Sequence, residues 1–449
     1  MASTRREFMI GMGALAVAAA LPEKRALAQG AQGMNARDRV VICNEDSNTL
    51  SVIDPNSNTV ATTINLTSFD EDPRPPFRFV TGGVMPAHAA MVVKPLYHGA
   101  INIHGAAPSP DNRLLACTGR GSSNVYLVNL ETMKVIGNTP NPQAGSDSNA
   151  ERITTGVLVG REPHEPTFSR NGKELWVTVR GENRIAILDP AAIVKGARGV
   201  RAYLDCMNGP AQAWFSADGA LAFVISQKGS QLEVFETHFG PDGFSRPRRR
   251  ALIDIKAQDA FGFTPFQKLS PDGKELWLSH KLADAVSGWA AGPEPKPLDT
   301  VDLGKQARPN HVEYVENRQG KVVYVSLARV DDNGPGGVAA SQIAIIDRGV
   351  APGSRKVVGT FYSHAREAHG LWINPENTRL YIAHEQDELP NTPNAGQTVC
   401  TAFDVSDPLK PGFIAQIPLG ELALPSGKLR NKKSINLVYV RPGAKSQTA

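Results

Sequence analysis

Residues 161–177 read R-E-P-H-E-P-T-F-S-R-N-G-K-E-L-W-V, and this stretch decides the fold. A short segment with β-strand character begins at His164, a turn follows around Gly172, and a second β-rich segment comes after it. Three further copies of the pattern also place a histidine where the first strand begins, at His104, His311 and His369. Short strands separated by turn residues in a repeating unit predict a β-propeller.

The number of repeats predicts seven blades. Six inner strands can be read along the chain, at residues 104–109, 164–169, 211–216, 265–270, 311–316 and 369–374. The chain opens with the second, third and fourth strands of a blade, at 40–44, 50–54 and 59–65, and the missing first strand is found at 434–440. The fold class is therefore predicted to be all-β, a seven-bladed β-propeller whose N- and C-terminal strands share one blade. Such a closed ring leaves few exposed sheet edges.

Residues 1–28 are predicted to be a targeting signal and not part of the fold. The motif S-T-R-R-E-F at 3–8 resembles the twin-arginine export signal, an apolar segment follows to residue 21, and A-L-A at 26–28 gives a cleavage site. That apolar segment is too short to span a bilayer comfortably, so no membrane span is expected. Residues 29–449 are expected to form one propeller domain that is exported to the periplasm.

Insertions lengthen four of the predicted repeats. They lie at 67–102, 138–160, 330–341 and 385–397. Links that enter inner strands and links between second and third strands emerge on the same face of a propeller, so all four insertions should crowd that face. Ordinary variation in loop length would also produce them, but their grouping on one sector favours a lid.

Residues 41–54, V-I-C-N-E-D-S-N-T-L-S-V-I-D, followed by T-V-A-T-T-I at 59–64, resemble the repeat of the YVTN family of β-propellers. The likeness covers nearly all of residues 38–442. It implies the propeller fold, whereas function is only weakly implied, because the family includes surface proteins, lactonase-like enzymes and redox proteins.

Composition and motifs exclude several classes of function. A net charge of +4 without a basic patch interleaved with aromatic residues argues against nucleic-acid binding. The four cysteines include no C-x-x-C pair; three fall within predicted strands as small buried residues, and Cys206 lies in a loop. No G-x-S-x-G nucleophile motif and no glycine-rich phosphate loop is present.

The repeated histidine position predicts a metal site. In blade order the position at the start of the inner strand is occupied by Asn436, His104, His164, Ala211, Pro265, His311 and His369. Inner strands surround the central channel of a propeller, so the four imidazoles are expected to converge on one side of it. Neutral imidazoles are the usual ligands of copper, zinc, iron and nickel, and the alternative is a polar channel lining bonded to water or backbone.

Charged residues complete the predicted site. Strand alternation places Glu313 on the same face as His311, one step deeper in the channel. Its carboxylate could be a metal ligand, a group that orients a ligand, a general base, or the partner of a salt bridge to the next blade. The same alternation turns Glu165 and Glu367 away from the channel. Three arginines lie three residues before a histidine and are expected to capture an anion at the channel mouth: Arg161, Arg308 and Arg366.

Further charged and histidine residues lie near this mouth. Cations occupy equivalent ends of second strands, at Arg120, Arg180 and Lys281. Five more histidines lie in or near loops of the same face and could complete a site: His88, His98, His280, His364 and His384.

Three functions are compatible with this pattern. The first is a periplasmic, copper-dependent oxidoreductase that acts on a small anionic molecule and exchanges electrons with a periplasmic carrier. Its architecture is similar to the catalytic propellers of nitrous oxide reductase and thiocyanate dehydrogenase, although the paired histidines and the cupredoxin domain of the reductase are absent from the sequence. The second is a lactonase-like hydrolase that uses His164, Glu313 and Arg161. The third is a non-catalytic propeller that binds a ligand or serves as a scaffold.

Overall fold

The computed structural model describes residues 34–66, 101–136, 139–140, 153–154, 156–424 and 427–447. Asn35–Ala449 form one compact unit. The targeting signal expected at 1–28 lies outside the described residues, as do most of the insertions expected at 67–102 and 138–160. Among the residues described, no helix has the length and hydrophobicity that a bilayer crossing requires.

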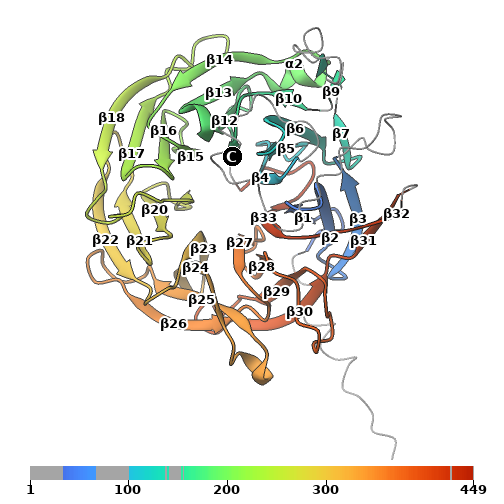
Figure 1. Cartoon of the computed structure of the whole chain (residues 1–449). Coiled ribbons are helices and arrows are strands. Elements are labelled where there is room, and N and C mark those ends of the chain that lie inside the picture. The colour runs from blue at the N-terminus through green and yellow to red at the C-terminus, as the bar shows by residue number, and fades with distance from the viewer. Residues whose placement is uncertain are drawn as a thin grey trace, which may run out of the picture. The chain divides into compact units, whose positions relative to one another are not determined.

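Within the described residues, seven antiparallel sheets follow one another around a ring and confirm the predicted seven-bladed propeller (Figure 1). Each blade begins with an inner strand beside the central channel. In blade order these strands are β33 (Ser434–Val440), β4 (Ile103–Pro108), β11 (Pro163–Phe168), β15 (Pro210–Phe215), β19 (Gln267–Leu269), β23 (Pro309–Asn317) and β27 (Ala368–Ile373).

The remaining strands build each blade outward by hairpin connections. Second strands are β1 (Arg39–Asn44), β5 (Leu114–Gly119), β12 (Leu175–Val179), β16 (Leu221–Ser226), β20 (Glu275–His280), β24 (Gly320–Asp331) and β28 (Arg379–His384). Third strands are β2 (Thr49–Asp54), β6 (Asn124–Asn129), β13 (Arg184–Leu188), β17 (Gln231–Glu236), β21 (Ala285–Ala290), β25 (Ala340–Asp347) and β29 (Val399–Asp404).

Outer strands are more exposed and more polar than the strands inside them. They are β3 (Thr59–Asn65), β14 (Val200–Asp205), β18 (Arg248–Asp254), β22 (Lys296–Asp302), β26 (Val357–Tyr362) and β30 (Gly412–Pro418), and in the second blade both β7 (Lys134–Ile136) and β10 (Val157–Leu158) pair with β6. Small additions complete the described chain: β8 (Thr139–Pro140) with β9 (Ile153–Thr154), β31 (Glu421–Leu424) with β32 (Gly427–Arg430), the helix α2 (Pro190–Val194), and the 3-10 turns η1 (Arg180–Glu182) and η2 (Pro335–Gly337).

The two ends of the chain meet in one blade, as predicted. Strand β1 pairs with both β2 and β33, so that the sheet order is β3-β2-β1-β33. Side chains also join the ends, because the Tyr439 hydroxyl donates to Asp38 at 2.6 Å and Arg441 bonds the same carboxylate. Pairing of β1 on both sides leaves it no free edge.

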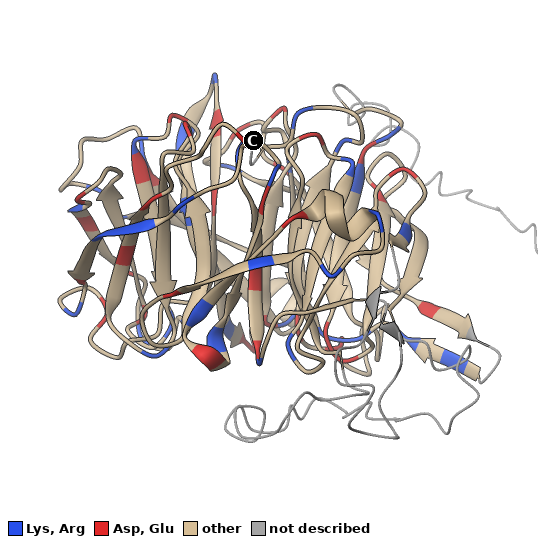
Figure 2. Ribbon diagram, turned by 90° about the horizontal axis from the view of Figure 1, so that it is seen from above, with Lys and Arg blue, Asp and Glu red and all other residues tan. Residues whose placement is uncertain are grey.

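The core consists of alternating apolar residues packed between neighbouring blades. Fully buried rings at these interfaces include Trp176, Trp277, Trp289, Tyr324 and Tyr381. Three of the cysteines are buried in strands as predicted, at Cys43, Cys117 and Cys400, and Cys206 is partly buried. In Figure 2 basic and acidic residues are interspersed along strands and loops.

Candidate metal centre

Each inner strand that carries a channel histidine contains a β-bulge at that histidine, and the bulge determines which side chains face the channel. In β11, Pro163 pairs with Val179 and Pro166 pairs with Val177, so one extra residue of β11 is accommodated between them. A bulge interrupts the alternation of side chains along a strand. As a result both His164 and Glu165 line the central cavity.

The same irregularity recurs in five other inner strands, which gives two rings of side chains. The first bulge position is occupied by Ile435, His104, His164, Ala211, Asn310 and His369. The second is occupied by Asn436, Gly105, Glu165, Gln212, His311 and Gly370.

The prediction that Glu165 faces away from the channel is therefore wrong. The prediction that Asn436 and His311 share the position of the other histidines is also wrong, since both come one place later. The bulge explains the error at Glu165, because side chains do not alternate strictly along a strand that contains an extra residue. His311 is displaced for another reason, since β23 is nine residues long whereas β11 and β27 have six, so counting back from the turn puts His311 one place too early.

All four predicted histidines line one cavity of about 190 Å³. Their rings follow an arc, with ring centroids 4.5 Å apart for His164 and His104, 6.3 Å for His104 and His369, and 4.9 Å for His369 and His311. His311 also stacks on Phe266, with centroids 3.8 Å apart. The structure therefore brings together imidazoles from four separate blades.

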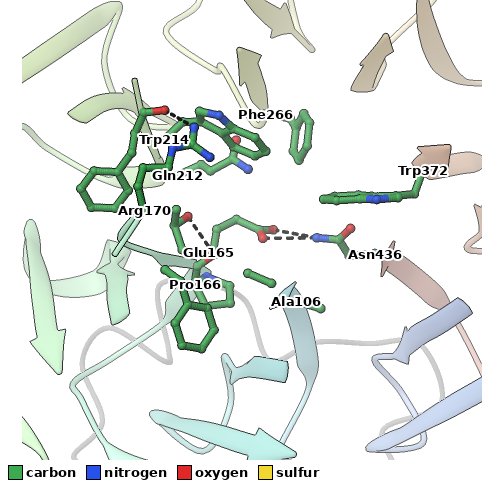
Figure 3. A pocket seen from close by; sticks show the side chains of 13 residues that line it. Ala106, Glu165, Pro166, Arg170, Gln212, Trp214, Phe266, Trp372 and Asn436 are labelled. Carbon is green, nitrogen blue, oxygen red and sulfur yellow. Dashed lines mark hydrogen bonds between the residues drawn. The ribbon is translucent and has the colours of Figure 1, made fainter. Parts of the chain in front are cut away.

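Ligand atoms converge most closely at one end of this arc. His104, His164 and Glu165 each offer an atom within 4.8 Å of the other two, and no other group of three such residues occurs in the described part of the chain. His311 and His369 lie outside this group. Glu165 is held beneath the histidines by the side-chain amide of Asn436, which donates to its two oxygens at 3.2 and 3.4 Å (Figure 3).

His164 has both ring nitrogens engaged. Its Nδ1 lies 2.9 Å from the carbonyl oxygen of Ala211, which can only accept, so Nδ1 carries the proton. Its Nε2 then accepts from the side-chain amide of Gln227 at 3.1 Å. Gln227 is oriented in turn by Arg180, which donates to its oxygen. A metal ion bound at Nε2 of His164 must replace this amide.

Two of the other histidines have a buried ring nitrogen without a hydrogen-bond partner, Nδ1 of His311 and Nδ1 of His369. Nδ1 of His104 instead faces the Glu45 carboxylate at 3.5 Å. Buried polar atoms without partners are uncommon in folded proteins and require an explanation. Imidazole nitrogens beside a carboxylate are a donor set that zinc, copper, iron and nickel all accept. The residues present therefore fit a transition metal.

Burial keeps these imidazoles neutral, which is the state that metal binding requires. Removal from solvent, helped by the Arg120 charge, lowers the pKa of His104 to about 3. Burial also holds the pKa of His164, His311 and His369 well below the usual value. Burial raises the pKa of Glu165 to about 8 although Arg120 opposes the shift.

Four cations line the same cavity: Arg120, Arg180, Lys281 and Lys433. Arg120 and Lys433 both contact Glu45, at 2.5 and 2.7 Å. Although burial alone would raise it, these two charges hold the pKa of the Glu45 carboxyl well below its usual range. Arg180 pairs with Glu162 at 3.1 Å.

Lys281 differs from the other cations. Its Nζ donates to the Asn310 side-chain oxygen at 2.6 Å, and none of the ion pairs in the described residues includes it. It is therefore the cation of the cavity whose charge is least balanced by a contacting carboxylate.

The three arginines predicted to capture an anion lie elsewhere. Arg161 contacts Glu182 at 3.8 Å, Arg308 is exposed, and Arg366 donates to the Asp387 carbonyl oxygen. None of them lines the histidine cavity. Each lies at or just before a residue with positive φ, where the chain turns into the inner strand: Glu162, Arg308 and Glu367. The turn carries their side chains away from the channel.

Glu313 also lies outside the histidine cavity. It faces the channel, but both of its oxygens accept from Lys268 at 2.7 Å, on the inner strand of the neighbouring blade. Lys268 is further held against the Trp372 ring, 3.9 Å from its centroid. Of the four roles predicted for Glu313, the observed contacts match the salt bridge to a neighbouring blade.

Two of the additional histidines belong to the protein interior. His280 is fully buried in a hydrogen-bonded chain in which Trp289 donates to Ser287, Ser287 contacts Nε2 of His280, and Thr264 contacts Nδ1. This serine and histidine resemble part of a catalytic triad but are inaccessible. His384 is likewise fully buried, and His364 stacks on Phe413. His88 and His98 lie outside the described residues.

Several residues of the site were not among the predicted functional residues, including Glu45, Glu165, Gln227, Asn310 and Lys433. Lys433 has a positional signal in the sequence, because it directly precedes the inner strand β33 just as Glu162 directly precedes β11. Glu45 and Gln227 follow second strands, where cations had been noted in other blades. Nothing in the sequence indicates that Glu165 faces the channel, because the bulge that turns it there is not apparent in the sequence.

The fold is shared with many solved structures, and those described below have low sequence identity to this chain. No family model and no curated protein matches the chain. Hydrazine synthase from Kuenenia stuttgartiensis is 15% identical, with a TM-score of 0.54 over 80% of this chain and 94% of that chain.

A candidate 6-phosphogluconolactonase from Bacteroides fragilis is 12% identical, with a TM-score of 0.56 over 90% and 98% of the two chains. The dihydro-heme d1 dehydrogenase NirN is 11% identical, with a TM-score of 0.50 over 91% and 76%. At these identities the comparisons establish the β-propeller fold alone.

Proposed function

We propose that this chain is an exported, metal-dependent oxidoreductase that binds copper in the histidine cavity and acts on a small anion. One observation carries the proposal: four neutral imidazoles from four blades line a single buried cavity together with four cations. His104, His164 and Glu165 are the residues that would hold the metal. When bound, a copper ion would supply one-electron chemistry and polarise a ligand.

Charge supports an anionic substrate. Glu45 is ionised, whereas burial raises the pKa of Glu165 to about 8 and of Glu385 to about 7, so that near neutral pH Glu165 is mostly protonated and Glu385 is protonated in part. Four cations then outweigh the ionised carboxylates that line the cavity. Buried cations attract anions strongly because solvent screens them weakly.

The residues of this chain would bind and orient the substrate and exclude water. Lys281 is placed to contact an anion directly, and Arg120 is held in position by Glu45. A cavity of about 190 Å³ admits a molecule of only a few atoms. Electrons would pass to a separate carrier in the periplasm, which the twin-arginine signal and the YVTN-like repeats of the sequence favour as the location.

The lactonase alternative is less well supported. Its three working residues are not assembled, because His164 lines the histidine cavity while Glu313 pairs with Lys268 and Arg161 contacts Glu182. We therefore do not propose hydrolysis as the function.

Elemental analysis of protein exported by a native-like host tests the proposal. We expect stoichiometric copper, with an absorption or electron paramagnetic resonance signal that is lost in His104→Gln and His164→Gln. His238→Gln is the matched control, because His238 is half exposed and pairs with Glu236 on the surface, outside the histidine cavity. Metal-free wild-type protein, or copper retained by both cavity variants, would contradict the proposal.

A further inference from the structure

A second, larger cavity of about 360 Å³ lies in the channel beyond the histidines. Its walls include Trp214, Lys268, Glu313 and the C-terminal residue Lys445, and it shares no lining residue with the histidine cavity. Between the two lies a space of only about 20 Å³ that Glu165 and Trp214 both line (Figure 3). That space holds about one water molecule, so the larger cavity is a separate site.

Trp214 has an unusual indole group. Four of the five tryptophans donate their ring N–H to a side chain: Trp176 to Glu174, Trp277 to Glu275, Trp289 to Ser287 and Trp372 to Gln447. The Trp214 ring N–H has no such partner in the described residues, although Trp214 is only 7% exposed. The side chain is largely buried while its N–H has no acceptor among the described residues, so this wall residue has a donor available for a ligand.

Carboxylate and amide oxygens on the cavity wall are already engaged. The two oxygens of Glu313 accept two bonds from Lys268, one from the Tyr314 N–H and one from the Ile373 N–H. The Gln447 side-chain oxygen accepts from Trp372. The wall therefore offers hydrogen-bond donors without a free side-chain carboxylate or amide acceptor to match them.

Positive charge accompanies these donors. Arg170 lines the cavity and uses Nε and Nη2 to hold the carbonyl groups of Ser216 and Phe215. Lys445 lies exposed at the mouth. Since Lys268 neutralises Glu313, the remaining charge of the cavity is positive.

Size and wall chemistry define the ligand class. A volume of about 360 Å³ corresponds to about twelve water molecules, far more than an inorganic anion fills. Apolar wall residues include Leu269, Pro271 and Ile373, and Trp214 presents a ring surface. We propose that this cavity binds a small organic carboxylate, whose anionic group accepts from the Trp214 N–H and whose apolar body contacts the ring walls.

Titration with benzoate, followed by calorimetry and by the indole N–H signals of nitrogen-labelled protein, tests this site. We expect saturable binding that shifts the one indole signal missing from Trp214→Phe. That variant should bind benzoate about tenfold more weakly, because a hydrogen bond to a charged group is lost. Benzyl alcohol, which has no carboxylate, should not bind.

Controls separate this site from the histidine cavity and from general surface charge. Lys445→Gln should weaken binding, whereas the exposed Lys410→Gln and the cavity variant His104→Gln should leave it unchanged. Retention of the other four indole signals in Trp214→Phe shows that the variant is folded. Absence of saturable binding, a shift confined to a different indole signal, or loss of binding in His104→Gln would overturn the proposal, whatever the metal content.

Discussion

The Gln227 side-chain amide donates to Nε2 of His164 at 3.1 Å and so occupies the nitrogen that a metal ion would use. The Ala211 carbonyl fixes the opposite nitrogen, Nδ1, as the protonated one. The imidazole is therefore already in the tautomer and orientation that a ligand needs. Gln227 competes with a metal for a prepared ligand, and the competition can be measured.

Replacement of Gln227 by alanine should strengthen metal binding. Loss of one hydrogen bond of about 1 kcal/mol in the metal-free state corresponds to about a fivefold higher affinity. Competition with a chromogenic chelator measures the change, and Arg180 keeps its Glu162 partner in the variant. An affinity that is unchanged or lower would show that the metal does not use Nε2 of His164.

Replacement of Lys281 by glutamine should weaken the binding of a small anion such as azide by about tenfold. The Lys281 ammonium group has no ion-pair partner in the described residues, so its charge is available to the anion, and a charge-assisted hydrogen bond contributes about 1.5 to 3 kcal/mol. Spectroscopic titration of the metal-loaded protein measures the affinity. Lys410→Gln serves as a control at an exposed lysine, and equal effects of the two variants would contradict the assignment.

Replacement of His280 by alanine should destabilise the fold without altering the metal site. The ring is fully buried and bonds Ser287 at 2.7 Å and Thr264 at 3.0 Å, so its removal leaves a cavity and unpaired hydroxyl groups. We expect a loss of about 2 to 4 kcal/mol in the free energy of unfolding. Denaturant unfolding measures it, with the half-exposed His238→Ala as the control. A loss of metal at unchanged stability would assign His280 to function instead.

Replacement of Lys268 by methionine should destabilise the protein by about 3 to 5 kcal/mol, because the buried Glu313 carboxylate loses its counter-charge. The double variant with Glu313→Gln should recover part of this loss. Burial raises the pKa of Glu313 even in the presence of Lys268, and removing Lys268 raises it further.

Because the pKa of Glu313 is raised, the loss of stability in Lys268→Met should depend on pH, and the direction of the change can be worked out. A raised folded-state pKa means that the folded protein binds the proton more tightly than the unfolded chain. The deficit of Lys268→Met should therefore be smallest below the unfolded glutamate pKa of about 4.3 and should grow as pH rises through the folded value. Unfolding curves at several pH values check the trend, and a deficit that grew on acidification would contradict it.

The fold could be predicted because its determinants are local in sequence. Turn residues and strand-forming residues alternate within each repeat, and the predicted closing strand at 434–440 coincides with β33. The repeat also predicts the shared cavity, because equivalent positions in a propeller face the same axis; His104, His164 and His369 are equivalent, and His311 reaches the cavity from the next position.

The detailed arrangement of the site could not be predicted in the same way. A bulge adds one residue to an inner strand without requiring a particular residue type, so the sequence places Glu165 on the wrong face. The longer strand β23 shifts His311 by one place relative to its turn, so the sequence assigns it to the wrong ring. Arg161, Arg308 and Arg366 do not lie at the channel mouth as predicted, because the turn before each inner strand directs their side chains away from the channel. Partners such as Gln227 come from a neighbouring blade and depend on tertiary packing alone.

Closure of the ring by β33 has a consequence for biosynthesis. Asp38 and Tyr439, which are hydrogen-bonded across the closing blade, are 401 residues apart in the chain. A growing polypeptide therefore remains an open arc until its last strand leaves the ribosome, and the exposed first blade must wait for it. Contacts this distant make folding slow, and one edge of β1 stays unpaired until β33 is available.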